Sequence, residues 1–317
     1  MPGSTLSVFG EPDDLQAALK EAGCVDLTVT GQGKFRARLS LIALHRTRLA
    51  MGEERQSRVA HFSIPLRCVR VTLPTQPQGS LVCNGTALRP GEIVTHSAGL
   101  RFHERTNGPC RWATMLVRTN DLVTLGHAMS GSRLALQPGD CRWQPTPDAL
   151  RSLIDLHRDA FAATTACPGL PVDDQAAHGL EQQLLEALIE CLVGVPTDCA
   201  NPAKHQRAEI MILFEEVVRS SPSGPPPLAE IRAALGVSDR TLRMCCHAHL
   251  GMGPGRYLYL HRMRSANREL RNADHTEASV AQIARLHGFD GRGSFPKAYR
   301  ALFGEAPSVT LRRPTTR

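Results

Sequence analysis

The sequence lacks the features that would place it in or across a membrane. No stretch approaches the ~18 consecutive apolar residues that a spanning helix needs. The N-terminus, MPGSTLSVFGEPDDLQAAL, has no basic segment followed by an apolar core, so no secretory signal peptide is expected. We therefore predict a cytoplasmic protein without a membrane partner.

The cysteines lack the spacing of a metal site. Ten of them are scattered along the chain, none in a CxxC or CxxC…HxxxH pattern, and the only adjacent pair is Cys245 and Cys246. In a protein without an export signal, the default expectation is reduced thiols.

Positive charge is concentrated in the last third of the chain. From Lys204 onward there are 18 Lys and Arg against 10 Asp and Glu, whereas the preceding part has 19 against 20. A neutral first part followed by a basic last part is expected when one domain binds a polyanion. A solvated basic surface without a partner is the alternative that charge alone leaves open.

Residues from about 31 to 120 read as β structure. The runs FRARLSLIALHRTRLAM (Phe35–Met51) and HFSIPLRCVRVTL (His61–Leu73) resemble strands, and the turn signals CNGT, RPGE and TNGPC recur at short intervals. Such spacing suggests a small antiparallel barrel or sandwich.

Two amphipathic helices are predicted after the strands, over Pro147–Thr164 and Asp174–Gly194. The second carries an apolar stripe that could pack on the barrel or on a second copy of itself. The stripe consists of Leu180, Leu184, Leu185, Leu188, Ile189 and Leu192.

The last part contains one motif twice. Leu228–Pro254 and Val280–Pro307 each show helical spacing, a glycine turn (Gly236, Gly288), a second helical run, and a closing Gly-x-x-Pro. This pattern predicts two helix-turn-helix units, whose second helices can lie in a DNA major groove. Ser238 is placed to cap the first recognition helix.

The outward faces of both recognition helices are candidate DNA contacts, because guanidinium groups there can reach guanine edges or phosphates. The candidates are Arg240, Arg243, Met244 and His247 in the first copy, and Arg292, Ser294, Lys297 and Arg300 in the second. Pro296 falls within the first turn if the second helix starts near Arg292, where it would remove a hydrogen bond. We therefore favour Arg240 and Arg243 as base readers over Arg292 and Lys297.

A single helix is predicted to join the two copies, from Pro254 to Asn272. At 1.5 Å per residue it spans roughly 28 Å, close to the ~34 Å between successive major grooves on one face of DNA. Its arginines, at positions 262, 264, 268 and 271, are expected to keep the helix soluble or to touch phosphates.

With these motifs in place, the last 110 or so residues resemble the DNA-binding domain of the AraC/XylS family of bacterial transcription regulators. The motifs that carry the resemblance are SDRTLR, IARLHGF, SF…AYRALFG and APS. The resemblance implies seven helices and sequence-specific promoter binding, with SSPSGPPP (Ser220–Pro227) as a loop between helices.

The first part resembles, more weakly, the cupin-like effector domain of many family members, through LRPGEIVTHS and HERTNGPCRW. Metal-binding cupins need a clustered His-x-His and a following Glu, and His96 and His103 lie too far apart for that pattern. We therefore predict no metal, no cofactor and no catalytic residues. His45, His61, His96 and His103 are read as surface or core residues.

The sequence thus predicts a multidomain α+β protein. Its parts are a cupin-like antiparallel β-barrel (1–145), a helical dimerisation hairpin (146–200) and an all-α double helix-turn-helix domain (201–317). The predicted function is that of a dimeric DNA-binding transcription regulator, and members of this family are more often activators than repressors. The protein is expected to contact RNA polymerase and to be controlled by a small-molecule or protein effector. The alternatives are a cupin enzyme with a DNA-binding appendage and a thiol-based sensor using Cys245 or Cys246.

Overall fold

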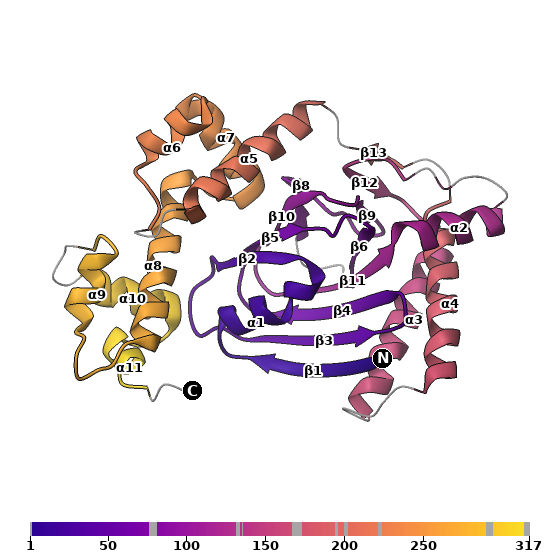
Figure 1. Ribbon diagram of the computed structural model, residues 1–317, viewed down its shortest axis with the longest axis horizontal. Coiled ribbons are helices and arrows are strands. Elements are labelled where there is room, and N and C mark those ends of the chain that lie inside the picture. Colours follow the sequence, from indigo (N-terminus) through magenta and orange to yellow (C-terminus); the bar gives the residue numbers. More distant parts are fainter. Residues whose placement is uncertain are drawn as a thin grey trace.

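The computed structural model describes residues 2–75, 81–130, 134, 136–166, 173–193, 196–199, 202–220, 224–289 and 294–313. Figure 1 shows a β-rich part formed by the first two fifths of the chain, with α3 and α4 along one side and the C-terminal helices along the other. The fold class predicted from the sequence, α+β with an all-α C-terminal part, is confirmed.

The larger sheet is antiparallel, in the order β1-β3-β4-β11-β6-β9-β12-β13. Each strand-like run seen in the sequence forms two strands, because Phe35–Met51 turns at residues 44–46 and His61–Leu73 turns at residues 64–67. The strands are β1 (Gly3–Phe9), β3 (Ala37–Ala43), β4 (Thr47–Glu54), β6 (Cys68–Pro74), β9 (Ile93–His96), β11 (Cys110–Arg118), β12 (Asp140–Trp143) and β13 (Asp198–Cys199).

The smaller sheet, in the order β2-β5-β10-β7-β8, is also antiparallel. One core joins it to the larger sheet, because Phe62 and Phe102 of this sheet cluster with Leu39 and Trp112 of the other. The strands are β2 (Cys24–Val29), β5 (Arg58–Ser63), β7 (Leu81–Cys83), β8 (Thr86–Ala87) and β10 (Arg101–Thr106). The short helices α1 (Pro12–Ala18) and η1 (Lys20–Ala22) precede β2.

Three helices pack on the larger sheet: α2 (Thr119–Ser130), α3 (Pro147–Ala166) and α4 (Asp174–Cys191). The predicted apolar stripe lies on α4 and continues to Leu192. Leu184, Leu185, Leu188 and Ile189 are buried in one cluster with Met115 and Val117 of β11. Of the two roles that the sequence left open for this stripe, the structure shows packing on the β domain. Because the chain itself covers the stripe, a partner copy would have to use another surface.

One cysteine pair departs from the expectation of reduced thiols. Cys141 of β12 and Cys199 of β13 are partners in the antiparallel pairing of these strands and form a disulfide. Their Cα atoms are 4.2 Å apart although 58 positions separate them in the sequence. Sequence spacing gave no sign of this pair, since only strand pairing brings the two residues together.

The C-terminal helices form two small cores, one for each copy of the repeat. The first core includes Phe214, Leu242 and Cys246, and the second includes Met263, Phe295 and Tyr299. The helices are α5 (Pro202–Ser220), α6 (Leu228–Leu235), α7 (Asp239–Leu250), α8 (Pro254–Asn272), α9 (Val280–Leu286), α10 (Ser294–Phe303) and α11 (Pro307–Leu311). Among the described helices, none is both long and apolar enough to cross a bilayer.

Candidate nucleic-acid interface

The first copy of the repeat is a helix-turn-helix with the predicted turn chemistry. Gly236 ends α6 in the left-handed conformation (φ 62°), which an L side chain would adopt only with strain. The backbone N–H of Thr241 donates to the Ser238 hydroxyl at 3.1 Å, so the predicted N-cap of α7 is confirmed. Gly251 (φ 74°) then closes α7 ahead of Pro254, the first residue of α8.

The second copy repeats this construction. Ser279 and Gln282 form a reciprocal capping box at the start of α9, and Gly304 (φ 75°) follows α10 ahead of Pro307. Because α10 begins at Ser294, Pro296 lies in its first turn, where backbone N–H groups need no intrahelical acceptor. The lost hydrogen bond was expected for a helix start near Arg292, which lies outside the described residues; counted from Ser294, Pro296 costs the helix no hydrogen bond.

The outward side of α7 presents its candidate contacts to solvent. Arg240, Arg243, Met244 and His247 are all exposed, whereas the opposite side of the helix is buried. The Arg243 Nε lies 2.8 Å from the Asp239 carboxylate one turn earlier, an ion pair that holds the guanidinium along the helix surface. This side of α7 combines cations, a thioether and an imidazole without any covering segment among the described residues.

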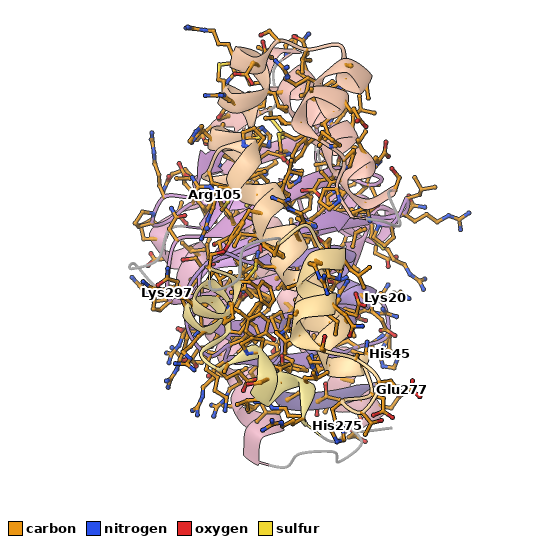
Figure 2. All side chains as sticks on the ribbon, turned by 90° about the vertical axis from the view of Figure 1, so that its left-hand side faces the viewer. Lys20, His45, Arg105, His275, Glu277 and Lys297 are labelled. Atoms are coloured by element: carbon orange, nitrogen blue, oxygen red, sulfur yellow. A yellow bond between two sulfur atoms is a disulfide. The ribbon has the colours of Figure 1, made fainter. Side chains whose placement is uncertain are left out.

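The outward side of α10 is also exposed. Ser294, Lys297 and Arg300 face solvent, while Phe295, Tyr299 and Leu302 fill the core beneath them. Figure 2, which looks onto the C-terminal helices, shows Lys297 toward the left margin of that face. Arg292 lies outside the described residues.

Helix α8 joins the two copies over the residues that the sequence predicted. In Figure 1 it runs from α6 and α7 at one end to α9, α10 and α11 at the other. The two recognition helices are thus attached to opposite ends of one rod of roughly 28 Å.

Three arginines of α8 form ion pairs with acids of the first part of the chain. Arg264 lies 2.8 Å from Asp13 and 2.6 Å from Asp26, and Arg268 lies 2.6 Å from Asp13, across the boundary with the β part. Arg271 pairs in the same way with Glu11 at 3.3 Å. Arg264 is buried, so the expectation that it solvates the helix or touches phosphates was wrong. Arg268 is exposed and Arg271 is half-buried within their ion pairs. The fourth, Arg262, is half-buried with its guanidinium 5.7 Å from the Phe289 ring centroid.

These ion pairs change the pKa values of the aspartates that form them. Burial is the largest single influence on the pKa of Asp26 and would raise it, but Arg264, His261 and Arg268 together outweigh burial and hold that pKa below its usual value. The same balance, with Arg268 and Arg264 as the cations, lowers the pKa of Asp13. Both carboxylates are therefore ionised at neutral pH, and the contact between the two parts of the chain is a charged one.

A second buried polar group lies between α5, α7, α8 and the smaller sheet. His61 of β5 stacks on His103 of β10 with ring centroids 5.0 Å apart, and His249 of α7 meets His103 edge-on at 6.0 Å. Burial lowers the pKa of His103 and of His249 to about 3, so both rings are neutral at pH 7. No sequence pattern indicated this cluster, because its members come from elements far apart in the chain.

The four histidines of the first part fall where the sequence placed them, on the surface or in the core. His45 is exposed, while the other three rings are buried. His96 Nδ1 lies 2.6 Å from the Asp140 carboxylate, which accounts for one of the buried rings.

The adjacent cysteines of α7 are both inaccessible. Cys246 faces the core, as its position in the helix predicted, and Cys245 is fully buried as well. Burial raises the pKa of both thiols, so the reactive thiolate is scarce at neutral pH. This environment is unlike that of a redox-sensing cysteine.

Comparison with known proteins points to the same region. Residues 231–313 match a family described as a helix-turn-helix domain. A probable thc operon regulatory protein of Rhodococcus erythropolis is 33% identical over 103 residues, which are 32% of this chain and 31% of that protein. An XylDLEGF operon transcriptional activator of Pseudomonas putida is 34% identical over 77 residues, 24% of this chain and 23% of that protein.

The chain thus spans about a third or less of the length of these two relatives. Among solved structures, the AraC-like transcriptional activator CuxR aligns with a TM-score of 0.43 and 13% identity, over 85% of this chain and 96% of that one.

Proposed function

We propose that this protein is a sequence-specific DNA-binding transcription regulator of the AraC/XylS type, because residues 231–313 match a helix-turn-helix family and carry the motifs of that group. The observation that carries the proposal is the structural repeat itself. Two capped helix-turn-helix units, each with an exposed polar and basic side, are attached to opposite ends of one helix. A helix-turn-helix domain of this kind implies DNA binding.

In this proposal α7 and α10 enter successive major grooves. Arg240 and Arg243 read bases, with Met244 and His247 beside them, because they stand on the exposed side of a well-capped helix. Ser294, Lys297 and Arg300 serve the second groove, together with Arg292. The basic C-terminal part supplies the attraction to phosphates that any specific contact requires.

The first part of the chain would act as the regulatory domain. We place its boundary near residue 145 and that of the DNA-binding domain near residue 201, with α3 and α4 between them. The ion pairs of Arg264 with Asp13 and Asp26 support coupling between the parts, because a signal that moves β2 or α1 must change contacts made by α8. The effector would be a small molecule or a protein.

The proposal extends to partners and compartment. A homodimer would place four recognition helices on the operator, and an activator would touch RNA polymerase while bound there. Because the DNA target is a bacterial promoter, the protein would act in the cytoplasm. Light scattering of the purified protein, with and without operator DNA, measures the first of these points directly.

Footprinting tests the core of the proposal. The purified full chain is bound to the DNA upstream of its own coding region, with and without cell extract as a source of effector. For each bound chain we expect a pair of protected patches about one helical turn apart, corresponding to its two recognition helices, so a homodimer should give two such pairs. Uniform protection at all concentrations, or none, would count against sequence-specific binding.

If the protein were an enzyme instead, it would need features that a regulator does not need. A cupin oxygenase or isomerase would need a catalytic centre inside the β part and turnover of a substrate by the purified protein. The two relatives compared above are named as a regulatory protein and a transcriptional activator, which favours the regulator. Alanine substitution of Arg240 that abolishes the footprint while leaving the fold intact would support the regulator further.

A further inference from the structure

Three elements bring metal-binding side chains to one buried point between the β part and the C-terminal helices. Asp26 of β2, Glu215 of α5 and His261 of α8 each offer one ligand atom, and these atoms all lie within 4.8 Å of one another. The Glu215 side chain is fully buried, and those of Asp26 and His261 are 10% and 12% exposed. Figure 1 shows β2 facing α8, the two elements that Asp26 and His261 occupy.

Each carboxylate has one oxygen held by donors and one oxygen without any. For Asp26, Oδ1 accepts from Arg264 Nη1 at 2.6 Å, whereas Oδ2 has no hydrogen-bond partner. For Glu215, Oε1 accepts from the Tyr257 hydroxyl at 2.6 Å, with His103 Nε2 at 3.2 Å, whereas Oε2 has none. Buried oxygens without partners are costly, so two at one point call for a cation or a donor between them.

The imidazole faces the same point. His261 Nε2 lies 3.7 Å from Asp26 Oδ2, with the Thr28 hydroxyl at 3.4 Å as its other neighbour. The His261 ring is held edge-on against the Tyr257 ring, with centroids 4.7 Å apart, so its orientation is set by packing. The donors to Asp26 and Glu215 fix those side chains in the way that outer-sphere partners orient metal ligands.

The surrounding charge leaves room for a cation. Arg264 is the nearest positive group, but it is shared between Asp26 and Asp13, and Arg268 also pairs with Asp13. Burial raises the pKa of the Glu215 carboxyl, and a metal ion bound there would favour its ionised form. With Glu215 ionised in this way, three acids face two arginines, and one negative charge is left over. A divalent ion would more than balance this negative charge. It would bind where Asp26 Oδ2 and Glu215 Oε2 lie, the only two carboxylate oxygens without donors among the described residues of this interface.

We propose that Asp26, Glu215 and His261 bind a divalent first-row transition-metal ion, with Zn²⁺ as the best-fitting probe. One imidazole nitrogen and two carboxylate oxygens are a ligand set that zinc accepts in proteins, with a fourth position left for water. Bound to one tetrahedral ion, ligand atoms lie about 3.4 Å apart, as follows from bond lengths near 2.1 Å. The three side chains need only a small inward movement to reach that spacing.

The site differs in residues and consequence from the cupin-type centre that the sequence argues against. It uses neither His96 nor the interior of the β part. Its ligands belong to β2 on one side and to α5 and α8 on the other, so a bound ion would tie the first part of the chain to the helices that carry the recognition elements. Metal binding can be measured without DNA. The proposed metal site can therefore be tested independently of the proposed DNA-binding function.

The test measures Zn²⁺ binding to the full chain after chelator treatment, by competition with a chromophoric indicator. We expect one tight site per chain, and a loss of about 100-fold or more in affinity in His261→Ala and in Glu215→Gln. Glu215→Gln keeps a side chain of the same shape and an acceptor for Tyr257, so it guards against a variant that fails to fold. His45→Ala is the matched control, because His45 and His178 form a surface histidine pair, 5.1 Å between centroids, that could bind zinc adventitiously.

Cobalt substitution identifies the ligands independently. Co²⁺ bound by nitrogen and oxygen should give weak visible d–d bands without the thiolate charge-transfer band of cysteine ligation. Loss of these bands in both site variants, and their retention in His45→Ala, would support the proposal. Unchanged binding in both site variants, thiolate bands, or no tight site in the unaltered chain would each overturn it.

Discussion

The guanidinium of Arg264 in α8 donates to the carboxylate of Asp26 in β2 at 2.6 Å, across 238 positions of sequence. The pair is largely buried, and Asp13 shares the same guanidinium at 2.8 Å. The helix that spaces the two recognition elements is therefore anchored to the first part of the chain by charge. A displacement of α1 or β2 relative to α8 would therefore change this contact.

Removing that anchor should destabilise the protein strongly. In Arg264→Ala, two carboxylates lose their buried cation, and we expect a loss of about 3–5 kcal/mol in the free energy of unfolding. Arg268→Ala is the control: its side chain is 45% exposed, and the expected loss is about 1 kcal/mol or less. Urea denaturation of both variants measures the difference. Similar small losses in the two variants would mean that the interface is not held by this pair.

Arg240 and Arg243 should carry sequence discrimination. If either reads a base, its substitution by alanine should cost ~1–3 kcal/mol of specific DNA binding and relax the preference at one operator position. Gel-shift titrations on the operator and on a scrambled duplex measure both quantities. Arg151→Ala, an exposed substitution on α3, controls for loss of general charge. An equal loss on both duplexes would assign the residue to a phosphate instead.

Residues 201–317 expressed alone should bind DNA with a steep dependence on salt. With at least three or four cations on phosphates, a slope of about −3 or steeper is expected in a plot of log affinity against log salt. A folded fragment with a flat salt profile would contradict the DNA-binding proposal.

Buried histidine should make the fold sensitive to acid. His157 of α3 is fully buried, and burial lowers its pKa to about 4 from an ordinary value of 6.5. Between those values the unfolded chain binds more protons than the folded one, so stability is complete above pH 6.5 and falls as the pH drops toward 4.

His157 should contribute on the order of 3 kcal/mol to the loss of unfolding free energy on acidification, because its pKa is about 4 in the folded chain and 6.5 in the unfolded chain. His157→Leu should therefore flatten the decline of the unfolding free energy between pH 7 and pH 4. His205→Ala, at an exposed position of α5, should leave the decline as it is. A decline of equal steepness in both variants would show that other groups govern acid stability.

Mild oxidation should leave operator affinity unchanged. Cys245 and Cys246 are buried, and their raised pKa values keep them as unreactive thiols. Gel shifts before and after treatment with a mild oxidant test this, with Cys245→Ser treated in parallel. A loss of affinity in the unaltered protein that Cys245→Ser prevents would revive the thiol-sensor alternative.

The C-terminal part could be predicted from sequence because its signals are local. A left-handed glycine, a serine N-cap and a proline at a helix start each act within one turn, so Gly236, Ser238 and Pro254 mark their elements without help from the rest of the chain. The outward position of Arg240 and Arg243 follows from helical periodicity in the same way. The strands at Gly3–Phe9 and Cys24–Val29 were not predicted from the sequence. Each depends on hydrogen bonds to a strand elsewhere in the chain, β3 for the first and β5 for the second.

The sequence by itself determined the repeat, its turns, the helix that joins the copies, and the exposed side of each recognition helix, since all of these depend on neighbours within a few residues. Only the tertiary structure decided what the arginines of α8 contact, where the α4 stripe packs, and that Cys141 meets Cys199. It also decided that Asp26, Glu215 and His261 converge. Those outcomes depend on which distant segments are brought together, and burial then sets the strength and cost of the charges enclosed there.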